Sequence, residues 1–294
     1  MTKRLEGVFG PVVTPFKAGS EDLDLAGFRA NLRAHMADGL AGVLVAGSNG
    51  EAALLSDEER VQLVAAARAE IPADRWLLVG TGSESTRQCV ARCRAAKEAG
   101  ADVVLVVAPH YYSAVMTAEA LEAHYTRVAD ESPLPVVLYN IPKYMHFALS
   151  AELVARLARH PNVIGVKDSS GDLEQLKGFL RAQAVGFTVL TGSGSGFHAG
   201  LDAGAQGGIL AVSLFSPALT LEVYRAQRAG DAARAAAAQA KLAPSAHVVV
   251  GKLGVAGVKG ALDHVGRVGG PARLPLMPLT AAERAAMVAA LAGE

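Results

Sequence analysis

Short runs of apolar, β-branched residues alternate along the chain with longer segments in which apolar positions recur at helical spacing. The short runs are candidate strands, and they span residues 8–14, 42–46, 76–80, 103–107, 136–139, 163–166, 188–190 and 208–212. Ser56 precedes three acidic residues and an apolar face, which predicts the start of a helix. Three further candidate helix caps are Thr117, Ser150 and Thr280. This alternation is typical of βα units around a parallel sheet.

The number of these units predicts an α/β fold of the (β/α)8 type, a TIM barrel, over residues 1–230. The rival is an open doubly wound sheet, but no candidate strand leads into the G-x-G-x-x-G that opens a nucleotide-binding helix. After the eighth strand the pattern stays helical from Pro217, and the alanine-rich stretch 232–240 favours a helix by propensity alone. We therefore expect residues 231–294 to form a C-terminal helical extension, divided by its glycines into short pieces, and not a second independent domain.

Composition narrows the class of function. Hydrophobic residues make up 51% of the 294 residues and charged residues 19%, and Lys+Arg equals Asp+Glu at 28 each, which argues against a disordered chain and against a nucleic-acid-binding protein. Charged residues, Gly or Pro interrupt the long apolar stretches, and few residues precede the first one, so we expect neither a membrane span nor a signal peptide. Two cysteines are typical of a reduced, cytoplasmic protein. The expected partner is a small molecule.

A lysine, Lys167, ends the sixth candidate strand, where the stretch 162–172 changes from an apolar run to a polar turn. In a closed barrel the carboxyl ends of the strands surround the active site. Burial there favours the neutral amine, which makes Lys167 a candidate nucleophile for imine formation with a ketone. The alternative from position alone is a lysine that extends to solvent or pairs with Asp168.

Two further features support a nucleophilic lysine. Tyr139 ends the preceding strand at the same level of the barrel, where a phenol passes protons between an imine and a substrate hydroxyl, although packing is the more frequent role of such a tyrosine. In the loop 47–51, glycines flank Ser48 and Asn49, which allows consecutive backbone N–H groups to bind an anion such as a carboxylate. An ordinary strand-to-helix turn is the alternative for this loop.

Together with the stretch 14–16, these motifs resemble the dihydrodipicolinate synthase and N-acetylneuraminate lyase family of class I aldolases over nearly the whole chain. The resemblance implies that Lys167 forms an imine with pyruvate and that Tyr139 relays protons. It further implies that Ser48 and Asn49, in the loop after the second strand, hold the pyruvate carboxylate. We also expect Gly47 of this loop, and Ser169 two residues after Lys167, among the substrate-binding residues.

The resemblance also describes the assembly. It implies that Tyr111 reaches a neighbouring subunit's site as part of the proton relay, in a homotetramer built from tight dimers. The sequence by itself leaves interface packing open as the role of Tyr111. We expect no cofactor and no metal, because the imine is itself the electron sink.

The choice of reaction depends on departures from the family pattern. Synthases that resemble this chain carry an arginine where Tyr144 stands, and they share with the sialic acid lyases a threonine where Asn49 stands. The lyases also carry an acidic pair after the seventh strand, which the stretch 192–196 lacks. The Ser48–Asn49 loop instead resembles that of 4-hydroxy-2-oxoglutarate aldolase and of 2-keto-3-deoxy-sugar-acid aldolases.

The sequence therefore predicts retro-aldol cleavage of a 4-hydroxy-2-keto acid to pyruvate and an aldehyde. One alternative is a 4-hydroxy-tetrahydrodipicolinate synthase, which condenses pyruvate with aspartate semialdehyde. A second alternative, of another class, is a regulatory protein that binds a keto acid without turnover. The sequence does not fix the aldehyde or the direction of reaction, and dehydration of a keto acid uses the same imine.

Other features suggest rival chemistry. Cys89 and Cys93 lie four residues apart on a predicted helix, but burial is favoured over a zinc site because no His or Cys pair is near in sequence. The stretch 192–196 resembles a phosphate-binding loop after the seventh strand, or else keeps the distal pocket open. Lys143 and His146 follow the tyrosine strand and either meet a distal substrate carboxylate or lie in a solvated loop.

Overall fold

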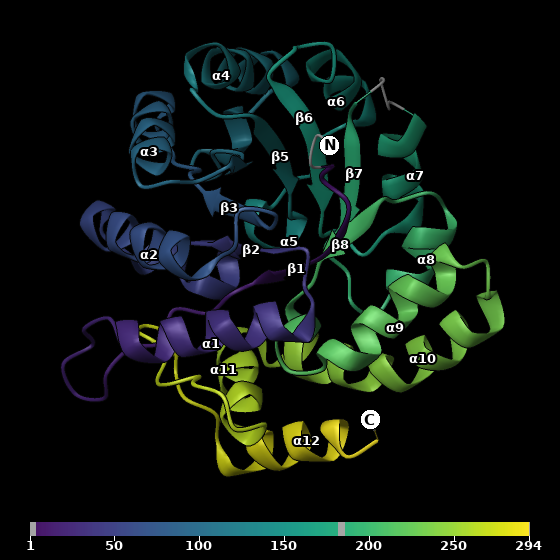
Figure 1. Cartoon of the computed structure of the whole chain (residues 1–294). Helices are drawn as coiled ribbons and strands as arrows, with labels where there is room; N and C mark the ends of the chain where they lie inside the picture. Colours follow the sequence, from purple (N-terminus) through teal and green to yellow (C-terminus); the bar gives the residue numbers. More distant parts are fainter. Residues whose placement is uncertain (1–3, 182–185, 294) are drawn as a thin grey trace.

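The computed structural model describes residues 4–181 and 186–293, and within these ranges eight parallel strands close into a barrel. The strands pair in chain order, and β8 pairs back onto β1. Helices surround them on the outside (Figure 1). The (β/α)8 barrel predicted from the sequence is thereby confirmed. The strands are β1 (Gly7–Pro11), β2 (Gly42–Val45), β3 (Trp76–Gly80), β4 (Val103–Val107), β5 (Val136–Asn140), β6 (Val163–Asp168), β7 (Thr188–Thr191) and β8 (Gly207–Ile209).

Four helices, three of the barrel and one of the C-terminal extension, begin where the sequence places caps. The four predicted caps, Ser56, Thr117, Ser150 and Thr280, each accept a hydrogen bond from the backbone N–H three residues on, which satisfies a donor that the helix itself leaves unused. The helices of the barrel are α1 (Leu25–Asp38), α2 (Asp57–Glu70), α3 (Thr86–Glu98), α4 (Ala118–Glu131), α5 (Pro142–Met145), α6 (Ala151–Leu157), α7 (Leu173–Arg181), α8 (Phe197–Asp202) and α9 (Pro217–Arg228).

The first and last strands are shorter than the apolar runs that predict them. The run 8–14 leaves the strand at Pro11, and the run 208–212 leaves it at Ile209, before the 3-10 turn η4 (Ala211–Leu214). The residues beyond both ends remain buried, with Val12 at 2% and Val212 at 1% exposure. An apolar run reports burial, and burial continues here after the strand pairing has ended.

The C-terminal extension contains α10 (Ala232–Ser245), the π-helical segment η5 (Ala246–Lys252), α11 (Gly254–His264) and α12 (Ala281–Leu291). Helix α10 packs along α9, α12 packs on α10 and α11, and α11 contacts the turn that follows β2. Figure 1 shows α10 to α12 gathered on one side of the barrel. No helix in the described part of the chain has both the length and the apolar character needed to cross a membrane.

The glycines of the extension do not all divide it, contrary to the expectation from sequence. Gly257 and Gly260 lie inside α11, where they allow close packing. A Cβ at Gly257 would lie 2.4 Å from the Val249 carbonyl oxygen, and one at Gly260 would lie 2.9 Å from Leu279 Cδ1. The gain from close approach outweighs the low helix propensity of glycine at these two positions.

The two cysteines are buried in α3, as the sequence indicates. Both have 0% exposure, and Cys93 Sγ lies 3.3 Å from the hydroxyl of Thr81. Among the described residues, no group of three or more His, Cys, Asp or Glu side chains is arranged to hold a metal ion.

Buried His124 gives the fold a predictable response to acid. Its Nδ1 lies 2.8 Å from Thr86 Oγ1, and burial lowers the pKa of His124 to about 4 from an ordinary value of 6.5. The unfolded chain therefore binds this proton at a higher pH than the folded chain does. The contribution of neutral His124 to stability is complete above about pH 6.5 and is lost as the pH falls toward about 4.

We expect His124→Phe to remove up to about 3 kcal/mol of this acid destabilisation, because a phenyl ring takes up no proton in either state. The measurement is the difference between the free energies of unfolding at about pH 7 and about pH 4, from denaturant titrations. A difference equal to that of the unsubstituted protein would contradict the prediction.

Candidate active site

Lys167 and Tyr139 are neighbours across β6 and β5. The pairing of these strands skips Ile164, which leaves Tyr139 directly opposite Lys167. In an unbroken register Tyr139 would face Val166, because a shift of one residue changes every pair that follows it. As a result, Lys167 Nζ lies 4.2 Å from the centroid of the Tyr139 ring.

The Lys167 side chain is enclosed by the barrel. Lys167 is 4% exposed and Tyr139 is 5% exposed, so the alternative in which the lysine extends to solvent is wrong. At the end of the neighbouring strand β7, the absence of a side chain at Gly192 provides space. A Cβ there would lie 3.1 Å from Lys167 Cε and 1.9 Å from Ser169 Oγ. The lysine and Ser169 therefore share one small space at the carboxyl end of β6.

The next pair in the register, Asn140 and Asp168, fixes the ends of the two strands. Asn140 Nδ2 donates to Asp168 Oδ1 at 2.7 Å, and Ser170 Oγ donates to Asp168 Oδ2 at 2.7 Å. Burial raises the pKa of Asp168, and these hydrogen bonds act in the opposite direction. The carboxylate thus holds the strand ends together, which is a different role from the pairing with Lys167 that the sequence leaves open.

The loop after β2 forms a 3-10 turn, η1 (Ser48–Gly50). Within it the Gly50 N–H donates to the Gly47 carbonyl at 3.0 Å. Such a turn makes no use of its own first N–H groups, which leaves those of Ser48 and Asn49 for a ligand. Ser48 Oγ lies 3.5 Å from the Tyr139 hydroxyl. The predicted anion-binding turn, the tyrosine and the lysine are therefore contiguous.

The stretch 14–16 supports this turn, which explains its place among the family motifs. Thr14 Oγ1 donates to the Gly50 carbonyl at 2.7 Å, and both residues are buried. A Cβ at Gly50 would lie 3.0 Å from the Val12 carbonyl oxygen, so the turn packs closely on the chain that follows β1.

A cleft of about 690 Å³ leads to the turn. It extends from Ser48 past Tyr144 and His146, which follow β5, and its wall includes Val255 of α11 and Leu276 of the segment before α12. The barrel and the C-terminal extension both line the approach to Ser48. Lys143, the other residue proposed to meet a distal carboxylate, donates from Nζ to the Gly251 carbonyl at 3.3 Å, which ties it to the extension.

Tyr111 lies outside the enclosed space around Lys167. Tyr111 is 77% exposed, and its ring packs edge-on against that of Tyr112 at 5.0 Å between centroids. Its position is fixed through the backbone, because Glu84 Oε2 accepts from the N–H groups of His110 and Tyr111 at 2.9 and 2.8 Å.

Two N–H groups of the glycine-rich loop after β7 are already bonded to nearby hydroxyl groups, which disfavours the phosphate-binding interpretation. The Ser193 N–H donates to Thr191 Oγ1 at 3.1 Å, and the Gly196 N–H donates to Ser193 Oγ at 3.2 Å. Gln239 of α10 reaches the loop from outside and donates to the Gly194 carbonyl at 3.0 Å. The loop is therefore held in shape by the extension.

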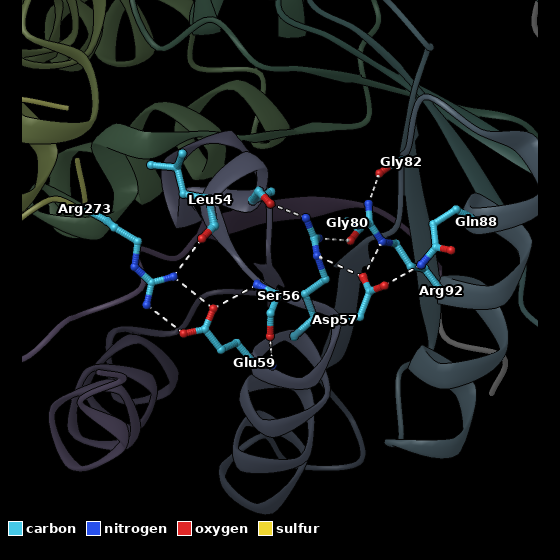
Figure 2. A network of polar contacts seen from close by, with 11 residues as sticks. Leu54, Ser56, Asp57, Glu59, Gly80, Gly82, Gln88, Arg92 and Arg273 are labelled. Atoms are coloured by element: carbon cyan, nitrogen blue, oxygen red, sulfur yellow. Dashed lines mark hydrogen bonds and ion pairs between the residues drawn. The ribbon is translucent and has the colours of Figure 1, made fainter. Parts of the chain in front are cut away.

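Sequence reasoning missed a cluster of charged residues beside the cleft, of which Arg60 and Arg92 line it. Asp57 accepts from Arg92 Nε at 2.7 Å, and Arg92 also donates to the Gly82 carbonyl at 2.8 Å (Figure 2). Arg60 donates to the Gly80 carbonyl at 3.3 Å, and burial lowers the pKa of its guanidinium to about 10. No local motif signals this cluster, because its members come from α2, α3 and the ends of β3.

Comparisons with known proteins agree with this geometry. Residues 4–293 match the model of the dihydrodipicolinate synthetase family. The chain is 35% identical over 280 residues to a 4-hydroxy-tetrahydrodipicolinate synthase of Methanoculleus marisnigri, with 95% of each chain covered. It is 38% identical over 283 residues to the enzyme of that name from Xanthomonas axonopodis pv. citri, with 96% of this chain and 92% of the other covered.

Solved structures lead to the same family. The chloride-inhibited dihydrodipicolinate synthase of Acinetobacter baumannii, complexed with pyruvate, superposes with a TM-score of 0.93 at 30% identity, with 98% of each chain covered. The match over nearly the whole length, together with the shared fold, shows that the chain belongs to the dihydrodipicolinate synthetase family, the class I aldolase family that its motifs resemble.

Proposed function

We propose that the chain forms an imine between Lys167 and the keto carbon of pyruvate, and that it makes or breaks a carbon–carbon bond at the neighbouring methyl carbon. The observation that carries the proposal is the buried Lys167 Nζ 4.2 Å from the centre of the Tyr139 ring, with Ser48 Oγ 3.5 Å from the hydroxyl of the same tyrosine. The pyruvate complex of the Acinetobacter baumannii relative supports the choice of keto acid.

The chemistry follows from the amine. Lys167 adds to the keto carbon, and loss of water gives a protonated imine. The imine accepts the electron pair released when the methyl group loses a proton or when the C3–C4 bond of a longer keto acid breaks. We assign the proton relay in these steps to Tyr139, because its ring lies beside Lys167 Nζ and its hydroxyl lies 3.5 Å from Ser48 Oγ. Hydrolysis of the imine returns the free amine and the keto-acid product.

We assign the substrate carboxylate to the turn after β2. The N–H groups of Ser48 and Asn49 and the Ser48 hydroxyl supply donors, and Gly47 lets the chain enter the turn closely packed, since a Cβ there would lie 2.8 Å from Leu44 Cδ2. Ser169 shares the space beside Lys167 and completes the proposed substrate-binding set.

The relatives favour condensation of pyruvate with aspartate semialdehyde. Both curated relatives described above carry the name 4-hydroxy-tetrahydrodipicolinate synthase, and they cover more than nine-tenths of this chain. This finding supports the synthase alternative over the cleavage reaction that Tyr144 and Asn49 led us to expect. We therefore propose the synthase reaction as the first candidate.

Retro-aldol cleavage of a 4-hydroxy-2-keto acid is the second candidate. It is favoured by Tyr144, which lines the cleft at the position where synthases resembling this chain carry a carboxylate-binding arginine. The neighbouring cation, Lys143, is engaged with the Gly251 carbonyl of the extension. A phenol in place of a guanidinium suits a substrate whose distal end carries hydroxyl groups.

Borohydride reduction in the presence of pyruvate is expected to leave one stable adduct on Lys167, detected by intact mass and peptide mapping. Lys167→Ala should abolish the adduct, and Tyr139→Phe should slow its formation by about a hundredfold because the proton relay is lost. A protein without an adduct, or an adduct that survives Lys167→Ala, would exclude the imine. A normal adduct without turnover of any substrate would support the regulatory keto-acid-binding alternative.

The two candidate reactions are separated by direct assay. We expect condensation of pyruvate with aspartate semialdehyde to exceed pyruvate release from any member of a panel of 4-hydroxy-2-keto acids. Tyr144→Arg should then raise the condensation rate further, because a guanidinium binds a second carboxylate in two places. Pyruvate release from the panel without condensation would reverse the order of the two candidates.

We propose that the chain assembles as a homotetramer of tight dimers in which exposed Tyr111 enters the site of the neighbouring subunit. Tyr111→Phe and Lys167→Ala should each be inactive alone. Subunits carrying one change each, mixed and reassembled, should regain activity because one of their two sites then has both groups. An active Tyr111→Phe variant would place Tyr111 outside the relay, and mixed oligomers that stay inactive would place it in the site of its own subunit.

A further inference from the structure

The C-terminal extension contacts Glu51, the residue directly after the turn that contains Ser48 and Asn49. Glu51 follows this turn and is 3% exposed, and Lys259 of α11 is 1% exposed. The two side chains form an ion pair between Glu51 Oε1 and Lys259 Nζ. Lys259 Nζ also donates to the Pro271 carbonyl at 2.7 Å and lies 4.5 Å from the centre of the Phe16 ring.

The backbone at Glu51 is in a conformation that needs support. Its φ of 57° and ψ of 38° lie in the left-handed region, which a residue with a side chain seldom adopts unless its surroundings hold it there. Both carboxylate oxygens are held by the extension, because the Arg273 N–H donates to Glu51 Oε2 at 2.8 Å while Lys259 pairs with Oε1.

Arg273 continues the same attachment along the chain after the turn. It donates to the Leu54 carbonyl at 2.7 Å and binds Glu59 through two nitrogens at 2.9 and 2.7 Å (Figure 2). Its guanidinium lies 4.1 Å from the centre of the Phe16 ring. The segment from Glu51 to Glu59 is thus fixed to the extension at three points.

A buried ion pair is a poor source of stability, because the cost of removing two charges from water offsets most of their attraction. The pair instead fixes the positions of both side chains, because a conformation that left Glu51 or Lys259 buried and unpaired would be strongly unfavourable. Glu51 also lines the cleft that holds Ser48, so that Lys259 cancels a negative charge beside the proposed carboxylate site.

We propose that Lys259 and Glu51 are positioning residues that hold the Ser48–Asn49 turn in the conformation that receives the substrate carboxylate, which makes the C-terminal extension part of the active site. This inference rests on the proposed function, because it assigns the carboxylate to that turn. Lys259 acts through Glu51 and takes no part in bond making.

The test compares two ketones that differ only at the carboxylate. Lys167 is labelled with borohydride and either pyruvate or acetone, in which a methyl group replaces the carboxylate, and the labelled peptide is quantified by mass spectrometry. Lys259→Met should raise the pyruvate concentration for half-maximal labelling at least about tenfold. A displacement of the turn by about 1 Å is enough to misalign its N–H groups with the substrate carboxylate. Labelling by acetone should stay as in the unsubstituted protein.

Two further variants keep the test decisive. Glu51→Gln keeps an oxygen for the Arg273 N–H while removing the charge, and it should weaken pyruvate labelling even if Lys259→Met folds poorly. The double variant should bind pyruvate no more weakly than the worse single variant, because both changes remove the same interaction.

Arg267→Met is the matched control: Arg267 pairs with Asp38 and so attaches the extension to α1 instead of to the turn. It should lower the melting temperature without changing the pyruvate dependence.

The outcomes separate the two proposals. An unchanged pyruvate dependence in Lys259→Met and Glu51→Gln, or equal losses with pyruvate and acetone, would overturn the positioning role alone. Failure of pyruvate to label Lys167 in the unsubstituted protein would overturn the proposed function and this inference with it. A selective loss with pyruvate, shared by both single variants and not increased in the double variant, supports the inference.

Discussion

The register between β5 and β6 is the constraint on which the site depends. Because side chains alternate along a strand, the one-residue shift at Ile164 decides which pairs meet at the strand ends. It places the lysine beside the phenol, and it brings Asn140 to Asp168 for the hydrogen bond that closes the strand ends. Gly165 follows the shift directly, and a Cβ there would lie 2.5 Å from the Thr188 carbonyl oxygen, so its lack of a side chain lets β7 approach on the other side.

Around this fixed pair, the barrel and the extension have separate tasks. The strands hold the Lys167 amine and the Tyr139 phenol in a rigid frame, which keeps their separation independent of the loops. The extension holds the loops at the mouth of the proposed site, through Lys259 and Arg273 at the segment after β2 and through Gln239 at the loop after β7. The proposed reaction centre and the loops around it are therefore stabilised by different parts of the chain.

The sequence predicts the strands, the helix caps and the level of the lysine and tyrosine, because each has a local signal: an apolar run, a capping side chain or a position at a strand end. It does not predict the shift at Ile164, which is an apolar strand residue like its neighbours. Helix propensity is a local property and predicts breaks at the glycines of α11, whereas Gly257 lies within the helix and allows it to pack closely on Val249. Glu51 and Lys259 lie too far apart in the chain for any pattern to link them, and the departures at Tyr144 and Asn49 pointed to a different reaction from the names of the relatives.

The attachment of the turn to α11 has a consequence for the order in which the protein matures during synthesis. All eight strands, with the lysine and the tyrosine, leave the ribosome before Lys259 and Arg273 do, because translation runs from the N-terminus. A nascent chain that has already closed its barrel still lacks both partners of Glu51. The order of elements along the chain thus delays completion of the proposed substrate site until the polypeptide is almost finished.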